Sequence, residues 1–343
     1  MKILNLAAIL FVIAFVVALI IIGKPLLIPF FLAVVIWYLI NAIYEQLTRL
    51  PLVSKIPKGL GLGLSATVIL GFLFLIGELL SQNINVMITA APDYKMSIEQ
   101  QLGRILSTFG ITEIPDFNTI SKDYNLANVI SPILNGVKNM AQNAFLILIY
   151  VVFMLFEQKF FTKKMAELRL SQERKDHLNI IFTKINTAAG SYITIKTFAS
   201  LLTGVLSYVV LIAVGVDFAI FWAFLIFLLN YIPTIGSIIA TAFPALLTLV
   251  QFDTFSPFFI VLIGVLGIQV AIGSFLEPRL LGNTLNISPL VVIIALALWG
   301  LLWGVVGMLL CVPITIILII VFAQFPDTRP IAVFLSKNGQ VGT

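Results

Sequence analysis

The sequence predicts an all-α fold: a polytopic α-helical integral membrane protein with a re-entrant helical hairpin and a small extracytoplasmic helical domain. Of its 343 residues, 60% are apolar and 10% are charged, whereas soluble domains carry about a quarter charged residues. The mean hydropathy is +1.12. Several uncharged runs reach the roughly 20 residues that a helix needs to cross about 30 Å of hydrocarbon. A closed barrel would show short alternating segments instead, so helices are the expected spanning element.

Three transmembrane helices are predicted within residues 1–79. The first covers about 3–22 and is longer than the apolar core of a typical signal peptide. The second covers about 26–43 and follows a Lys-Pro pair at once, so these two helices form a tight hairpin. The third covers about 60–79, and its glycine-rich start allows neighbouring helices to approach closely.

Residues 80–140 differ in composition, because they are polar and mildly acidic with apolar residues at helical spacing. This pattern predicts an extracytoplasmic domain of amphipathic helices, outside the bilayer or on its surface. Residues 141–196 follow with a fourth transmembrane helix, at about 141–156, and a basic helix. Positive charge marks cytoplasmic segments, so the basic helix and both termini are expected in the cytoplasm.

Residues 197–326 are predicted to form a C-terminal transport core. Its first helix covers about 197–215, and the uncharged stretch 218–252 comes next. The sequence NYIPTIGS (230–237) interrupts that stretch with a proline and a glycine. Two complete crossings need about 40 residues, and the two arms here are too short for that. The economical interpretation is a re-entrant hairpin that enters the bilayer and returns to the same side.

The remaining part of the core contains a further span, at about 257–276, and a broken helix within 285–326. The sequence WGLLWG divides the latter into a short arm and a full helix. Residues 327–343 form a cytoplasmic tail. Two broken apolar segments in one half of a membrane protein suggest a substrate pathway, because discontinuous helices expose backbone dipoles to a solute.

Two stretches of the core carry a family resemblance. LLNYIPTIGSIIATAFPALLTL and FLEPRLLGNTLNISPLVVIIALALWGLLWGVVGMLLCVP resemble the autoinducer-2 exporter family of bacterial membrane proteins. The likeness covers nearly the whole chain in layout and is specific from about 190 to 323. It implies a multi-pass, homo-oligomeric transporter of the bacterial inner membrane, which exports autoinducer-2 or exchanges monovalent cations for protons. The residues that match the family pattern are Asn230, Pro233, Gly236, Glu277, Pro278, Leu281 and Gly282.

Polar residues in the uncharged stretches are the candidates for lining the substrate pathway. Asn230, Thr234 and Ser237 supply hydrogen-bonding groups beside carbonyls that proline leaves without a donor. Gln269 and Ser274 either extend this lining or join helices. The alternative for NYIPTIGS is a helix break that packing tolerates. The full set of pathway candidates is Asn230, Pro233, Thr234, Gly236, Ser237, Gln269 and Ser274.

Glu277 and Arg279 are the only charged residues between Asp253 and Asp327. One interpretation is structural: Pro278 ends the helix, and Arg279 pairs with the carboxylate to clamp the loop against the hairpin tip. The other is functional, since carboxylates in transporters relay protons or bind cations as the protein moves. The candidates for an ion-coupling site or gate are Glu277, Arg279 and Asn283, the last of which replaces a lysine that is frequent in the family.

The sequence lacks the features of several other classes. It contains no recognisable catalytic motif and no nucleotide-binding glycine loop, so an enzyme is not expected, and secondary transport is. The net charge of +5 does not form an aromatic-lined basic stripe, so nucleic acid is not an expected partner. A single cysteine permits no intrachain disulfide or thiolate metal cluster, and no cofactor or metal is expected.

The predicted function is export of a small polar solute such as autoinducer-2. The alternative within transport is antiport of Na+ or K+ against H+, and a third hypothesis is a membrane receptor or scaffold. The expected partners are the small polar solute, Na+, K+ or H+, the lipid bilayer and further copies of the chain.

Overall fold

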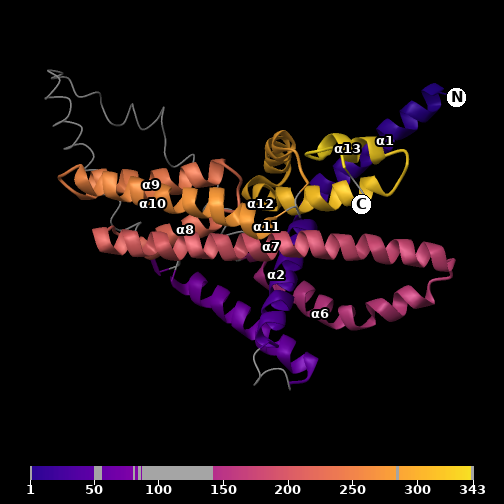
Figure 1. Ribbon diagram of the computed structural model, residues 1–343, viewed down its shortest axis with the longest axis horizontal. Coiled ribbons are helices and arrows are strands. Elements are labelled where there is room, and N and C mark those ends of the chain that lie inside the picture. Colours follow the sequence, from indigo (N-terminus) through magenta and orange to yellow (C-terminus); the bar gives the residue numbers. More distant parts are fainter. Residues whose placement is uncertain are drawn as a thin grey trace. The chain divides into compact units, whose positions relative to one another are not determined.

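The computed structural model describes residues 2–49, 56–79, 82–83, 86, 142–282 and 286–340. Every regular element in these ranges is a helix, which confirms the all-α prediction (Figure 1). The extracytoplasmic domain expected over 80–140 lies outside the described residues, apart from positions 82, 83 and 86. Within the described ranges, six helices are long and apolar enough to cross a membrane: Lys24–Leu47, Lys58–Leu79, Ala144–Phe161, Gln172–Val214, Ser256–Leu281 and Pro289–Ala323.

The chain divides into two compact units. Unit 1 comprises Met1–Ile69, Leu134–Ile193 and Thr284–Thr343, and unit 2 comprises Leu70–Ile133 and Thr194–Asn283. The five-part division expected from the sequence stays a prediction.

Unit 1 contains α1 (Lys2–Ile22), α2 (Lys24–Leu47), α6 (Ala144–Glu167), α12 (Pro289–Ala323) and α13 (Arg329–Leu335). Its first core joins α2, α6 and the start of the helix Lys58–Leu79 through buried aliphatic side chains. A hydrogen bond from Trp37 Nε1 to Gln158 Oε1, 2.9 Å long, adds a polar link between α2 and α6. The members of this core are Ala33, Ile40, Leu62, Ile69, Ile147 and Val151.

Helix α12 is interrupted at one residue. Gly304 adopts φ 64° and ψ −143°, a conformation that is essentially restricted to glycine. The sequence suggested a break across the whole of WGLLWG, but residues 299–303 are helical and the chain turns at the last glycine alone.

Unit 2 holds the elements that surround the candidate site. They are the second half of α7 (Gln172–Val214), α8 (Ala219–Leu229), α9 (Ile235–Gln251), α10 (Ser256–Val270), a π-helix η1 (Ala271–Leu276) and α11 (Glu277–Leu281). Helices α8 and α9 pack against each other as the two arms of a hairpin, and α9 lies beside α10 (Figure 1). The two short arms predicted over 218–252 are therefore present, and their 11 and 17 residues are fewer than the roughly 20 of a typical membrane-spanning helix.

Candidate functional site

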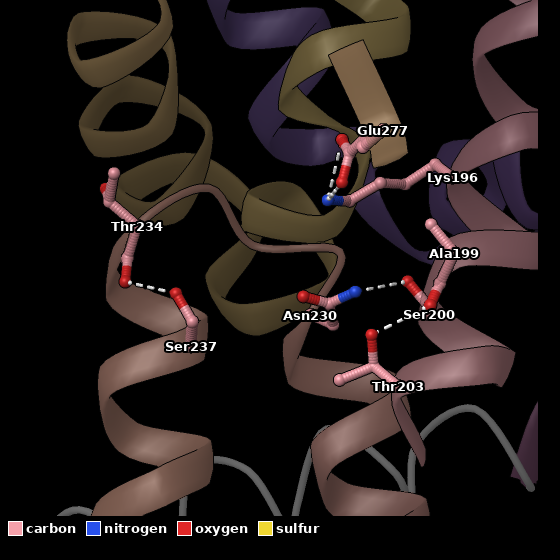
Figure 2. A network of polar contacts seen from close by, with 8 residues as sticks. All are labelled: Lys196, Ala199, Ser200, Thr203, Asn230, Thr234, Ser237 and Glu277. Atoms are coloured by element: carbon pink, nitrogen blue, oxygen red, sulfur yellow. Dashed lines mark hydrogen bonds and ion pairs between the residues drawn. The ribbon is translucent and has the colours of Figure 1, made fainter. Parts of the chain in front are cut away.

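The second half of α7 carries a line of buried polar side chains, which we call the α7 polar row: Lys196, Ser200, Thr203 and Ser207. Their spacing of four, three and four residues places them on one face of the helix. All four are buried, whereas Leu201, Val205 and Leu206 on the same helix are exposed. An apolar membrane helix thus turns its polar face inward. Thr203 bonds back to the Ala199 carbonyl at 2.8 Å, which satisfies its hydroxyl hydrogen within the helix (Figure 2).

Lys196, the first residue of the row, forms an ion pair with Glu277. The ammonium nitrogen lies 2.9 Å from Oε1 and 2.8 Å from Oε2, so it donates to both carboxylate oxygens (Figure 2). The lysine and glutamate side chains are only 9% and 14% exposed. Removal of two charges from water is costly, and such a pair persists only where the partners meet in good geometry. The contact therefore ties α7 to the start of α11.

The partner of Glu277 differs from the sequence-based expectation. The structural interpretation pairs Arg279 with this carboxylate, but Arg279 is exposed and Lys196 occupies the contact instead. The reason is helical geometry, since residues two apart on a helix do not face each other. Asn283, the third coupling candidate, lies outside the described residues. The role of these residues in coupling stays a prediction.

Pro278 does not end the helix, which corrects a second expectation. The chain passes from α10 through η1 into α11 and stops at Gly282, where φ is 52°. A proline inside an α-helix clashes with the carbonyl four residues earlier and lacks a donor for it. The wider π-turn just before the proline changes this register, and π-turns are frequent at functional sites. Glu277 therefore lies where the π-helix η1 ends and the α-helix α11 begins.

Asn230, at the end of α8, connects the hairpin to the α7 polar row. Its amide nitrogen donates to Ser200 Oγ over 3.1 Å (Figure 2). One residue further on, the Tyr231 hydroxyl lies 2.6 Å from Thr197 Oγ1. The hairpin tip is thus bonded to α7 through two neighbouring side chains, and Asn230 is half-buried.

The turn between the arms is tight. Thr234 has φ 58° and ψ −59°, a left-handed value that is uncommon outside glycine. A Cβ at Gly236 would stand 1.8 Å from the Leu229 carbonyl oxygen, so only glycine permits this approach of the two arms. Thr234 and Ser237 bond to local carbonyls, of Pro233 and of Thr234 respectively. Figure 2 shows the contact between Ser237 and Thr234 separate from the one between Asn230 and Ser200.

Gln269 and Ser274, the two candidates after the hairpin, lie in different surroundings. Gln269 is buried and donates to Thr241 Oγ1 at 2.9 Å, which joins α10 to α9. Ser274 is exposed on the π-turn. Among the described residues, three buried polar atoms of unit 2 have no hydrogen-bond partner: Ser207 Oγ, Trp222 Nε1 and Gln269 Oε1.

Sequence reasoning missed most of the α7 polar row. Lys196 is the last residue of the basic segment predicted over 141–196, and the row's hydroxyl residues fall in the span predicted at about 197–215, which contains no predicted site residue. Their spacing after a lysine, inside an apolar helix, was a detectable signal. Thr241, the partner of Gln269, gave no comparable signal. Within the described part of the chain no cluster of three or more His, Cys, Asp or Glu side chains could hold a metal ion.

These features define a multi-pass helical membrane protein with a polar interior in unit 2. A family model described as AI-2E family transporter matches residues 9–327. The chain belongs to this family, as the resemblance in its sequence suggested.

Individual relatives agree along most of their length. The chain is 33% identical over 318 residues to the AI-2 transport protein TqsA of Escherichia coli, covering 92% of this chain and 90% of the relative. A Haemophilus influenzae protein is 33% identical over 323 residues, with coverage of 91% and 90%. A Borreliella burgdorferi protein is 30% identical over 319 residues, with coverage of 90% and 84%. Of these three names, that of the Escherichia coli relative states a substrate.

Proposed function

We propose that this protein is a secondary transporter that exports a small polar solute, with the signalling molecule autoinducer-2 as the first candidate. The observation that supports the proposal is the α7 polar row together with Asn230, because it sets hydroxyl, amide and ammonium groups inside a membrane protein. Polar groups are costly to bury and are kept in membrane interiors mainly where they have a function.

The chemistry of these groups suits a hydroxylated solute. Ser200 and Asn230 both donate and accept hydrogen bonds, and the hairpin tip beside them exposes helix ends and non-helical backbone. Irregular backbone at membrane depth is tolerated where it lines a cavity or is buried in protein. Because the sequence has no nucleotide-binding loop, an ion gradient or the solute gradient itself would drive the movement. The substrate name of the Escherichia coli relative favours autoinducer-2 as the first solute to test.

Flux in vesicles tests this proposal. Purified protein is reconstituted into liposomes, autoinducer-2 is supplied on one side, and its transfer is followed against protein-free vesicles and against a panel of other polar solutes. We expect transfer well above the protein-free rate, and slower transfer for Ser200→Ala. Equal rates with and without protein for every solute would contradict transport and would favour a receptor or scaffold.

Exchange of Na+ or K+ for H+ is the second candidate, and the buried ion pair favours it. Glu277 holds a carboxylate away from bulk water against the Lys196 ammonium, as expected of a group that exchanges one cation for another. Imposed Na+ or K+ gradients should change the internal pH of vesicles, and Glu277→Gln should abolish the change while the protein stays folded. An unchanged pH response in that variant would exclude this role.

The cellular setting follows from the same proposal. We place the protein in the bacterial inner membrane as a homo-oligomer, as the family resemblance implies. Both termini are placed in the cytoplasm, because the basic residues between the fourth and fifth spans mark the cytoplasmic side. Cysteine labelling from outside intact cells at introduced sites in residues 2–5 and 337–340 tests the orientation, and labelling of either end would contradict it.

A further inference from the structure

We propose that Lys196 is a tethered competitor for the cation site of this transporter: its ammonium group occupies the Glu277 carboxylate, and a Na+, K+ or H+ ion binds there only when Lys196 leaves. The inference rests on the second transport mode proposed above, cation and proton exchange through Glu277. It adds the identity of the group that the transported ion must displace.

The geometry supports displacement over simultaneous binding. Lys196 Nζ contacts both oxygens of the carboxylate, at 2.9 and 2.8 Å. Alkali cations are bound in proteins by oxygen ligands, and each Glu277 oxygen already faces the ammonium group. The ion pair and a bound cation therefore need the same two atoms.

Charge balance leads to the same conclusion. One ammonium and one carboxylate sum to zero in a setting where both side chains are largely removed from water. A second cation at the carboxylate would leave one positive charge without compensation, which a low-dielectric interior strongly disfavours. A cation bound after Lys196 has withdrawn restores the neutral sum at the carboxylate, and the displaced ammonium avoids the same penalty because its flexible stem carries it towards water.

Among the described residues of unit 2, no other titratable side chain forms an ion pair or a hydrogen bond with Lys196 or Glu277. Arg279, two residues from Glu277, is exposed. The Tyr231 hydroxyl contacts Thr197 Oγ1. Asp217 and Asp253 lie at the far ends of the hairpin arms from the tip, beyond the start of α8 and the end of α9. The exchange between ammonium and bound cation thus concerns Lys196 and Glu277.

Lysine is the residue type suited to this task. Its ammonium is a compact charge on a flexible four-carbon stem, so the nitrogen can withdraw while the α7 backbone stays in place. Arginine would bind the same carboxylate through a rigid two-pronged contact and stay charged under all conditions. The lysine-to-arginine change therefore separates competition from simple charge pairing.

The test compares Lys196→Gln and Lys196→Arg with the unaltered protein in liposomes. The half-saturating Na+ or K+ concentration for exchange is measured at one fixed pH, and folding is checked by size-exclusion chromatography. Loss of the competitor in Lys196→Gln should lower the half-saturating concentration at least tenfold. The stronger competitor in Lys196→Arg should raise it at least threefold. Lys163→Gln, which removes an exposed lysine of α6, is the matched control and should leave it unchanged.

The possible outcomes are distinct. Exchange that persists in Lys196→Arg with an unaltered half-saturating concentration would overturn the inference and leave cation exchange standing, and this holds even if Lys196→Gln fails to fold. Opposite shifts in the two variants would support it. Absence of any cation exchange in the unaltered protein would contradict the second transport mode, and this inference with it.

Discussion

Asn230 donates a hydrogen bond to Ser200 across 3.1 Å, although the two residues are 30 positions apart in the chain. The bond joins the last turn of α8 to the middle of the α7 polar row. A break in one apolar helix and a polar face on another thereby become parts of one structure. Because of this bond, the hairpin tip together with the α7 polar row is the most direct candidate for the wall of a solute-binding site.

Loss of either partner should slow solute transfer. Ser200→Ala and Asn230→Leu each remove one side of a partly buried hydrogen bond, a change that typically costs about 1–3 kcal/mol when a buried partner is left unsatisfied. We expect roughly tenfold slower flux in each variant, in line with about 1.4 kcal/mol per factor of ten. Ser256→Ala removes an exposed hydroxyl at the start of α10 and is the control. Normal flux in both variants would argue against this wall.

Separation of the charge pair should destabilise the protein more than its complete removal does. Lys196→Met or Glu277→Leu alone leaves one buried charge without its partner, and breaking such pairs costs about 3–5 kcal/mol. The double variant removes both charges, so its loss of stability should be smaller than the sum of the two single losses. Thermal inactivation in detergent measures all four proteins. Losses that simply add would show that the two side chains do not interact.

The hairpin turn should tolerate no side chain at Gly236. A methyl group there would overlap the Leu229 carbonyl oxygen at 1.8 Å, so Gly236→Ala must push the two arms apart. We expect a clear fall in the midpoint of thermal unfolding and a loss of flux. Gly267→Ala is the matched control, because nothing lies within 4 Å of the added Cβ. A helical Gly→Ala change without a clash stabilises by about 0.5–1 kcal/mol, so the two variants should shift stability in opposite directions.

The bond between Gln269 and Thr241 should behave as a link between α10 and α9. Gln269→Leu removes the donor to the Thr241 hydroxyl, which still donates to the Ser237 carbonyl, so the expected cost is about 1 kcal/mol. Combination with Thr241→Val replaces both polar groups by apolar ones and should recover much of the loss, as is known for paired apolar replacements of similar shape. Unfolding in mixed micelles measures both. A double variant that is less stable than Gln269→Leu would contradict the prediction that this bond acts only as a link between α10 and α9.

Much of the helical layout could be predicted because it depends on local properties. Length and hydropathy locate the spans, and the proline and glycine of NYIPTIGS mark the hairpin turn. The extent of α7 was missed for the same reason: a change from polar to apolar composition at about residue 196 suggested a boundary, yet no residue there stops a helix. Composition reports the environment of a helix, while only caps, proline and backbone conformation end it.

The site was less accessible to sequence reasoning because its contacts are distant in the chain. Glu277 was identified by its charge in an apolar region, but its partner is 81 residues away and the nearby Arg279 was the obvious choice. Local spacing could have revealed the α7 polar row. No local rule could have revealed that the row faces Asn230 or that a π-turn precedes Glu277.

Helix α7 has 43 residues, and its length indicates how deep Lys196 lies in the bilayer. At 1.5 Å per residue the helix is about 65 Å long, roughly twice the hydrocarbon thickness of a bilayer. From Lys196 to its last residue, Val214, it rises about 27 Å, close to one full hydrocarbon thickness. With Val214 at one surface, the ammonium group stands near the opposite surface. Ions would then have only a short distance to travel from that surface to the buried Glu277 carboxylate, and the longer part of the route would lie between the carboxylate and the Val214 side.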